Sequence, residues 1–211
     1  RTACLDHPST VKWGDCFSTY LDWPLIWQAC HNPLSRDHTK AVVWEQLHLN
    51  FYTTFSYNKW HPKQQPQACP LCHTPPLSIF HLILTCPVTL ALWRLLSPLL
   101  TTLHPDPITP QEMAFGLTGA TPSHLLRNWL TYHLRECIQD QERMAYHSPQ
   151  APHVLLIQAA VNRAVSQELR DRLTLAQARL HMPLFLRRYA PRPVLLQQSQ
   201  DEWVITPPFP L

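Results

Sequence analysis

The sequence predicts a mainly α-helical protein. In it, a small Cys3His knuckle is embedded in helices and is followed by a long antiparallel helix pair and a proline-rich tail. Three observations predict this fold class. Apolar residues recur at helical spacing over two long stretches. Three of the seven cysteines lie close together among histidines, and 22 prolines divide the rest of the 211 residues into short segments. Hydrophobic residues make up 45% of the chain, so a core can form without disulfide bonds.

Residues 1–66 are predicted to form a helical, tryptophan-rich segment. Five of the eight tryptophans lie there. We expect them to pack in a core; the alternative is a platform on which nucleic-acid bases stack. The best helix of the segment begins at Asp37, a residue type that is favoured as an N-cap. Because the chain starts at Arg1 without a methionine, we expect it to be a piece of a longer protein.

The middle of the chain is predicted to divide into two regions. Residues 67–100 hold the Cys/His cluster and an apolar helix that starts at Pro87, since proline is favoured in the first turn of a helix. Residues 101–121 are a proline-rich linker. The four prolines within 98–110 predict that no continuous helix crosses this stretch. Thr109 is expected to cap a short helical turn inside it.

Residues 122–182 are predicted to form a helical hairpin. One helix spans about 122–147 and the other about 152–181, and their apolar stripes are expected to face each other in an antiparallel pair. The stripe of the second helix consists of Ile157, Val161, Val165, Leu169, Leu173, Ala176 and Leu180. Residues 183–211 contain six prolines and are predicted to be a tail that either runs extended over a neighbouring part of the protein or is disordered.

The charges are distributed unevenly. The net charge is +3, yet residues up to 123 balance to zero, with seven Lys or Arg and seven Asp or Glu. Residues 124–192 carry ten arginines, no lysine and five acids. Guanidinium groups bind phosphate and carboxylate in a bidentate way, so this segment suits the recognition of such anions. Ordinary solvated helix faces are the alternative, and the sequence leaves both interpretations open.

Several function classes are excluded or disfavoured. Only Gly14, Gly116 and Gly119 are present, so the chain cannot form the glycine-rich phosphate loops of the Rossmann or P-loop type. The motifs H-E-x-x-H and G-x-S-x-G are absent. The apolar stretches are shorter than the roughly 20 residues of a membrane span, and no secretory leader is evident. We therefore expect no membrane partner and a reducing, intracellular compartment.

One cluster has the spacing of a metal site. Cys69, Cys72, His81 and Cys86 form the pattern C-x2-C-x8-H-x4-C. Three sulfurs and one imidazole nitrogen predict a single structural Zn²⁺, closed by four protein ligands. His73 is the competing nitrogen ligand, and it is less favoured because it directly follows Cys72. The remaining cysteines lack partners at ligand spacing and are expected to be core thiols, namely Cys4, Cys16, Cys30 and Cys137.

The cluster and its flanks resemble the C-terminal zinc-binding region of the reverse transcriptases of LINE-class non-LTR retrotransposons. The segments that carry the resemblance are Trp44-Glu-Gln-Leu, Phe51-Tyr-Thr-Thr-Phe, His61-Pro62, Cys69-Pro-Leu-Cys72, Phe80-His81-Leu, Cys86-Pro87-Val and Leu92-Trp93. The segments Ala114-Phe-Gly-Leu117 and Leu125-Leu-Arg-Asn-Trp-Leu130 are similar to the tail of elements that carry an apurinic-type endonuclease. The resemblance covers about residues 38–147.

The resemblance implies an accessory module that assists engagement of template RNA or target DNA. Its expected partners are RNA or DNA and the rest of the parent reverse transcriptase polyprotein, in a cytoplasmic ribonucleoprotein or the nucleus. Residues 1–66 would then follow the polymerase thumb. Polymerase and nuclease residues are absent from this chain, so we expect no catalysis by the chain itself. The alternative is a zinc-stapled helical protein-interaction module with no nucleic-acid role.

Six basic residues are predicted to contact nucleic acid. Two lie eight residues apart on the first long helix and are expected to share one track of the backbone. Two follow Pro183 in the tail, where they are expected to wrap a strand, and two flank the knuckle. These residues are Arg127, Arg135, Arg187, Arg188, Lys59 and Lys63.

Overall fold

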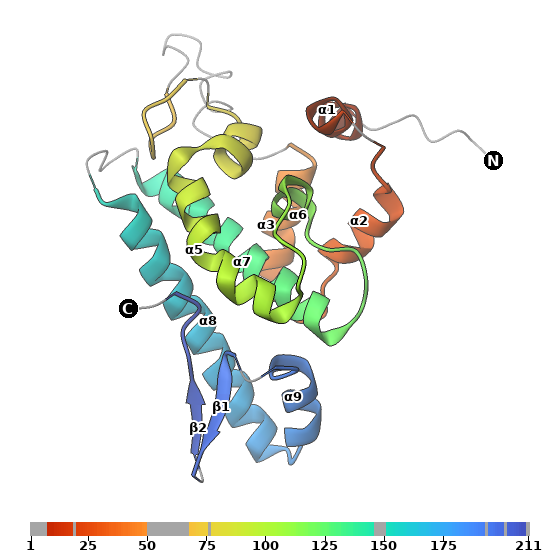
Figure 1. Cartoon of the computed structure of the whole chain (residues 1–211), viewed down its shortest axis with the longest axis vertical. Coiled ribbons are helices and arrows are strands. Elements are labelled where there is room, and N and C mark those ends of the chain that lie inside the picture. Colours follow the sequence, from red (N-terminus) through yellow and green to blue (C-terminus); the bar gives the residue numbers. More distant parts are fainter. Residues whose placement is uncertain are drawn as a thin grey trace, which may run out of the picture.

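Helices make up most of the chain, as predicted (Figure 1). The computed structural model describes residues 8–18, 20–49, 68–75, 77–145, 151–192, 194–200 and 202–209. The helices are α1 (Pro8–Phe17), α2 (Trp23–Cys30), α3 (Asp37–Leu47), the π-helix η1 (His81–Thr85), α5 (Pro87–Leu103), α6 (Pro110–Phe115), α7 (Pro122–Ala145), α8 (His153–Ala178) and α9 (Met182–Tyr189). Two short strands, β1 (Leu196–Ser199) and β2 (Glu202–Ile205), follow α9.

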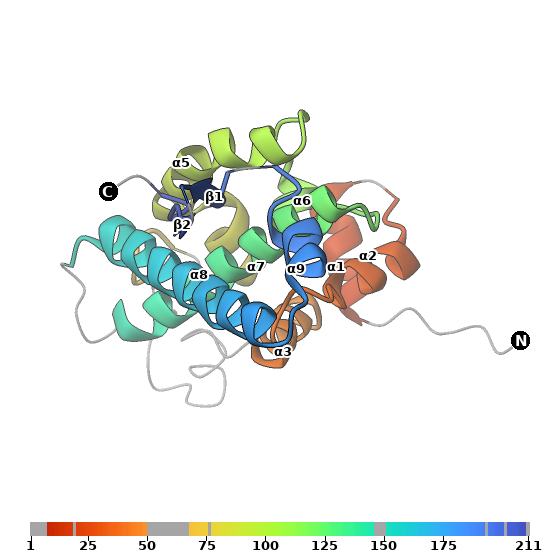
Figure 2. The same cartoon turned by 90° about the horizontal axis from the view of Figure 1, so that it is seen from below.

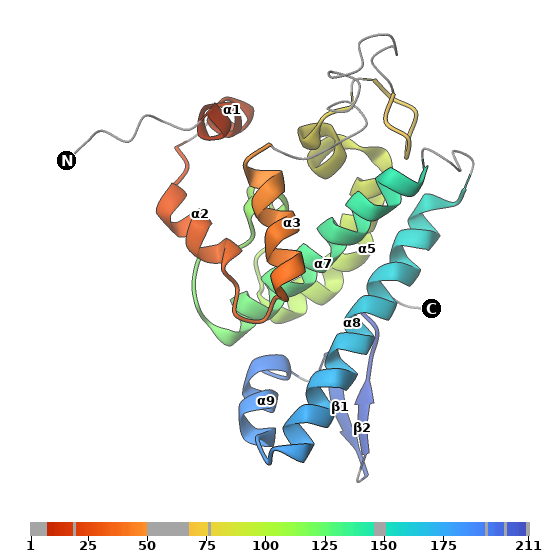
Figure 3. The ribbon, with the colours of Figure 1, turned by 180° about the vertical axis from the view of Figure 1, so that it is seen from behind.

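Helix α7 lies at the centre of the structure. It packs against α3, α5, α8 and α9, and Figure 3 shows α3 on one side of it and α8 running beside it. Ten consecutive residues of α7, 126–135, are buried. Since an α-helix turns once every 3.6 residues, such a run covers every face. Helix α7 is therefore enclosed on all sides over this stretch.

Helix α8 is one of four helices that pack against α7, whereas the sequence predicted a pair of α7 and α8. The apolar stripe of α8 is buried from Ile157 through Val161 and Val165 to Leu169. Helices α7 and α8 also share polar contacts, because Trp129 Nε1 donates to Glu168 Oε1 at 3.3 Å. Yet α7 has three further helical neighbours and no solvated face between 126 and 135. The sequence predicted burial of one apolar stripe of α7, whereas all faces of the helix are buried between 126 and 135.

Helix α5 runs without a break through Pro98 and ends at Leu103, inside the predicted linker, and α6 begins at Pro110, so no continuous helix crosses 98–110, as predicted. Proline cannot donate the backbone hydrogen bond to the residue four positions earlier, which is Arg94. Arg94 and Pro98 are both exposed. The carbonyl that loses its partner therefore lies on the water side of the helix, where the loss costs least.

The described residues of the C-terminal segment are folded, so the prediction of disorder is wrong, and α9 contradicts a tail that is extended throughout. Helix α9 contains Pro183 in its first turn, where proline is tolerated. Strands β1 and β2 pair antiparallel, with Leu196 opposite Ile205 and Ser199 opposite Glu202. Phe209 is fully buried, and its backbone N–H donates to Asn162 Oδ1 on α8 at 2.9 Å. Pro183 lies in the first turn of α9, and the other prolines of this segment lie outside α9, β1 and β2, so no proline interrupts an element.

The N-terminal helices pack as a core, which agrees with the expectation for Trp13. This side chain is fully buried, and its Nε1 donates to the carbonyl of Leu47 at 3.0 Å. Trp44 is different, since 46% of it is exposed. Asp37 is the first residue of α3, and the N-cap is Arg36 without a side-chain hydrogen bond. Trp60 lies outside the described residues.

The predicted linker is fixed to α7 by a buried guanidinium. Arg127 Nη2 donates to Glu112 Oε2 at 2.6 Å, and both side chains are buried. Arg127 Nη1 donates to the carbonyls of Leu100, His104 and Asp106 at 3.1, 2.7 and 2.9 Å. Glu112 lies in α6, whose N-cap Thr109 accepts from the Glu112 N–H as predicted. One arginine thus holds α6 and the end of α5 against α7.

A buried carboxylate connects α7, α8 and the turn before α3. Glu168 is fully buried and forms ion pairs with Arg172 and with Arg36, whose Nε lies 3.0 Å away. His133 Nε2 lies 3.1 Å from Glu168 Oε2. Burial by itself raises the pKa of Glu168, but the hydrogen bond with His133 and the nearby arginine charges outweigh it, and the net pKa is lowered.

Removing the buried guanidinium should strongly destabilise the fold. Arg127→Ala leaves Glu112 buried and unpaired, which costs about 3–5 kcal/mol in comparable buried pairs. Urea denaturation followed by circular dichroism measures the loss. Arg94→Ala, at an exposed arginine of α5, should change the unfolding free energy by less than about 0.5 kcal/mol. Equal stability of the two variants would contradict the buried network.

The buried carboxylate should also make stability depend on pH. Because the folded-state pKa of Glu168 is lowered, its contribution is present above the pKa of the unfolded chain and is lost as pH falls through the folded-state value. Wild type should therefore exceed Glu168→Gln in unfolding free energy at pH 7, and the gap should narrow below about pH 4. Denaturation at both pH values measures the gap. A gap that is constant or widens in acid would show that the carboxylate is not stabilised by its partners.

Candidate metal centre

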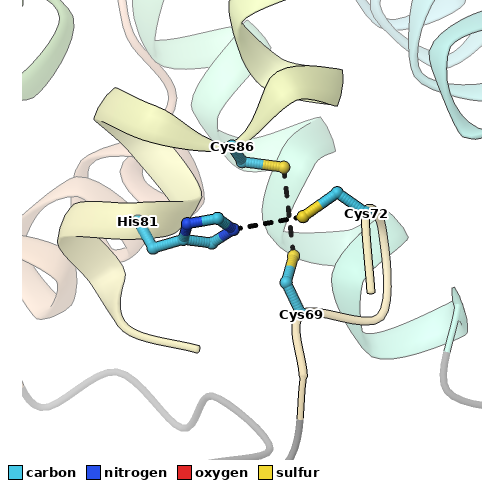
Figure 4. A group of neighbouring side chains, drawn as sticks. All are labelled: Cys69, Cys72, His81 and Cys86. Atoms are coloured by element: carbon cyan, nitrogen blue, oxygen red, sulfur yellow. Dashed lines mark hydrogen bonds between the residues drawn. The ribbon is translucent and has the colours of Figure 1, made fainter. Parts of the chain in front are cut away.

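Four donor atoms from the predicted cluster meet at one place (Figure 4). The donor atoms of Cys69, Cys72, His81 and Cys86 all lie within 4.8 Å of one another. The sulfurs of Cys69 and Cys86 are 3.9 Å apart, and Cys72 Sγ lies 3.2 Å from His81 Nε2. In a tetrahedron with metal–sulfur bonds of about 2.3 Å, two sulfurs are about 3.8 Å apart. The cluster therefore has the dimensions to bind a single metal ion.

The first two cysteines belong to a tight turn. The N–H of His73 donates to the carbonyl of Cys69 at 2.7 Å, and the N–H of Cys69 donates to the carbonyl of Thr74 at 3.0 Å. His73 has a φ of 60°, a left-handed conformation that reverses the chain. This reversal places Cys69 and Cys72 on the same side of the turn.

The other two ligands lie at the two ends of a π-helical turn. In η1, the N–H of Cys86 donates to the carbonyl of His81 at 2.7 Å. This i to i+5 bond widens the helix, so that residues five apart come to the same side. The backbone of Cys86 then turns to an extended conformation, and Pro87 begins α5. The π turn thus explains how the spacing H-x4-C serves one site.

The position before α5 favours an ionised sulfur at Cys86. A hydrogen bond from the Cys69 thiol lowers the pKa of Cys86 to about 5, against the effect of burial. The backbone N–H groups of Val88 and Thr89, in the first turn of α5, add to this stabilisation. The same contact and burial raise the pKa of Cys69. A second thiolate so close to the first needs a cation beside it, which a metal ion supplies.

His81 is held in a fixed orientation by its own neighbours. Its Nδ1 lies 3.2 Å from Thr85 Oγ1, and its backbone N–H donates to Ser78 Oγ at 3.0 Å. When Nδ1 is protonated and donates to Thr85, Nε2 keeps a free lone pair that faces Cys72. Thr85, which contacts His81 through its hydroxyl, was not predicted from the sequence. Its position one α-helical turn after His81 was the available signal.

The site is continuous with the hydrophobic core. Cys69 and Cys86 are fully buried, and Cys72 and His81 are partly buried. Buried apolar side chains adjoin them in the chain, namely Leu71, Leu77, Ile79, Leu82 and Ile83. His73, the competing ligand, is exposed and is not part of the cluster. A metal ion here would join the turn at 69–74 to the start of α5.

The remaining cysteines have different surroundings. Cys30 and Cys137 are buried, and burial raises the pKa of each to about 12, so both are inert core thiols as expected. Cys16 is exposed, so the expectation of a core thiol is wrong there. It lies in the last turn of α1, on the side that faces solvent. Cys4 lies outside the described residues.

The predicted nucleic-acid contacts of α7 are wrong. Arg127 and Arg135 are 0% and 1% exposed, and a phosphate backbone cannot reach them. Arg135 Nε donates to Gln46 Oε1 at 2.7 Å and Nη1 to the carbonyl of Ala114 at 2.6 Å. Burial lowers the pKa of Arg135 to about 10, which still leaves it charged at neutral pH. Both arginines hold α7 to its neighbours.

The other predicted basic residues are not brought together with these two. Arg187 and Arg188 are exposed in the last turn of α9. Lys59 and Lys63 lie outside the described residues. Arg187 and Arg188 therefore lie in α9, which follows α8 after the turn at 179–181.

A cavity beside α9 was not predicted. It has a volume of about 190 Å³ and lies between the C-terminal end of α8 and α9. Three arginines line it, Arg172, Arg179 and Arg188, together with His181. The spacing of these residues gave no signal, since α8 and α9 must fold back on one another before the side chains share a space.

Comparison with protein-family models, curated proteins and solved structures finds no match. Over the described residues, no helix has both the length and the apolar character needed to cross a bilayer. The metal-binding interpretation therefore depends on the geometry of the four donor atoms.

Loss of the outer-shell hydroxyl should weaken metal binding. Thr85→Val removes the acceptor that orients His81, and comparable outer-shell changes reduce metal affinity about 10–100-fold. Competition with a chromophoric chelator measures the affinity for Zn²⁺. Thr102→Val is the matched control, because this exposed threonine bonds only within α5 through its hydroxyl. Unchanged affinity in Thr85→Val would show that Thr85 does not orient the ligand.

Proposed function

We propose that this protein is a zinc-stabilised accessory module that binds nucleic acid within a LINE-class reverse transcriptase and does not catalyse by itself. The observation that carries the proposal is the cluster itself. Its four donor atoms meet within 4.8 Å, and their order and spacing in the chain resemble those of that family. The rest of the parent polyprotein would be its permanent partner.

Zinc is the metal that suits this ligand set. Thiolate sulfur and imidazole nitrogen in a tetrahedral arrangement favour Zn²⁺ over the harder cations, which prefer oxygen. Four protein ligands leave no coordination position for a water or a substrate. The ion would accordingly organise the fold by holding the turn at 69–74 against α5.

The nucleic-acid part of the proposal is supported by a basic surface. Arg179, Arg187 and Arg188 are exposed around the turn between α8 and α9. Within the described part of the chain, none of the three forms an ion pair with a carboxylate. Arginine groups without carboxylate partners are free to bind phosphate in a bidentate way.

A protein-interaction module remains the second candidate, and one observation favours it. Leu175, Leu180 and Leu184 are 48%, 88% and 48% exposed near the same turn. Apolar side chains gathered on a surface are typical of protein contacts. Salt separates the two functions, because phosphate contacts release counterions and a contact between apolar surfaces does not.

The metal part of the proposal has a direct test. Protein purified under reducing conditions should contain one zinc per chain by elemental analysis. Cys72→Ser should abolish stoichiometric zinc, since it removes one of four ligands at a partly buried position. Cys16→Ser changes an exposed cysteine of α1 outside the cluster and should leave the zinc content at one. Zinc-free wild type, or full zinc in Cys72→Ser, would contradict the assignment.

The nucleic-acid part is tested by salt titration of a short fluorescent RNA. The affinity of wild type should fall as salt rises, by about 0.7 log units per log unit of salt for each phosphate contact to a single strand. The double variant Arg187→Ala/Arg188→Ala should bind more weakly and show a smaller slope. Arg94→Ala, on α5, is the charge-matched control for a single arginine. No RNA binding by wild type would favour the protein-interaction module instead.

A further inference from the structure

We propose that the cavity between α8 and α9 binds one backbone phosphate of single-stranded nucleic acid, together with the adjoining sugar or base. The inference rests on the proposed nucleic-acid function and deepens it, because it names the place and the form of the ligand. Figure 2 shows α9 beside the C-terminal part of α8, and the two helices are in contact.

Arg172, one of the residues that line the cavity, is held in place by other protein groups. Arg172 Nη2 donates to the carbonyl of Leu34 at 2.8 Å and to Glu168, and Nη1 donates to the Tyr189 hydroxyl. The guanidinium also lies over the Tyr189 ring, 5.2 Å from its centroid. Four contacts from three elements fix this arginine before any ligand arrives. A fixed donor loses little side-chain entropy on binding, which favours affinity.

The cavity carries an excess of positive charge. The negative charge of Glu168 offsets the positive charge of Arg172. Glu168 also contacts Arg36 and His133. Arg179 and Arg188 line the same cavity, are exposed, and form no ion pair within the described ranges. Two guanidinium groups without carboxylate partners, one just after α8 and one in α9, match the charge of a phosphate.

The apolar residues that line the cavity indicate a ligand that carries a sugar or a base as well as a phosphate. Leu175, Leu184 and Phe185 line the cavity beside the arginines, and the two leucines are each 48% exposed. Apolar walls of this kind suit the carbon face of a sugar or the flat face of a base. A recess between two helices is accessible to a flexible strand, whereas the bases of a duplex are stacked inside it and cannot enter. These two features together favour a single strand.

The test compares two neighbouring arginines on α9. Arg188 lines the cavity and Arg187 does not, although both are exposed in the same turn. With full-length protein and a fluorescent oligouridine, Arg188→Ala should lose about tenfold in affinity, as expected for a charged hydrogen bond. Arg179→Ala should behave likewise. Arg187→Ala should lose about threefold or less, since it removes only a charge outside the cavity. Arg188→Lys should recover part of the loss, because lysine keeps the charge without the fork of donors.

Each outcome decides a different question. Greater losses at Arg179 and Arg188 than at Arg187 support the cavity. Equal losses at all three positions would overturn it, while the proposed nucleic-acid function would stand as a diffuse charge effect. Tighter binding to duplex than to oligouridine would also overturn the single-strand inference. If wild type binds neither oligouridine nor duplex at low or moderate salt, both the cavity and the nucleic-acid part of the proposed function fail. Circular dichroism of each variant excludes misfolding as the cause of a loss.

Discussion

The structure depends on the enclosure of α7 by its neighbours. A helix that is buried on every face keeps its polar side chains from water, so hydrogen bonds inside the protein stabilise those side chains that form them. Tyr132 donates to the carbonyl of Phe115, and Asn128 both donates to and accepts from the backbone of Leu117. With the arginines of α7, these bonds fix where α6 and the segments beside it lie. The polar groups of one helix thereby determine much of the arrangement around it.

The candidate metal site lies next to the start of α5, one of the helices that enclose α7. Cys86 directly precedes α5, and Trp93 in α5 donates to the carbonyl of Ile83 in η1 at 3.1 Å. Helix α5 in turn packs against α7 and α8. A metal ion between Cys69 and Cys86 would hold the irregular turn at 69–74 to these helices.

The sequence predicts the structural features that depend on the spacing of residues close to one another in the chain. The pattern of the cysteines with His81 and the capping of α6 by Thr109 involve residues close in the chain, and their geometry follows from one turn or one helix. The burial of Arg135 could not be foreseen, because its partner Gln46 lies 89 residues away. The same is true of Phe209, which bonds to Asn162 across 47 residues. A proline-rich composition also conceals a folded segment when the prolines stand at its edges.

The central claim is that α7 forms the rigid centre of the fold and that a metal ion holds the knuckle, the turn at 69–74 that carries Cys69 and Cys72, against the helices around α7. Hydrogen exchange followed by mass spectrometry, with and without a chelator, tests both parts at once. The account predicts the slowest exchange in peptides from α7, and a loss of protection on chelation that is confined to 68–75, η1 and the first turn of α5. Rapid exchange in α7 would contradict the account. So would unchanged protection around the knuckle after the metal is removed.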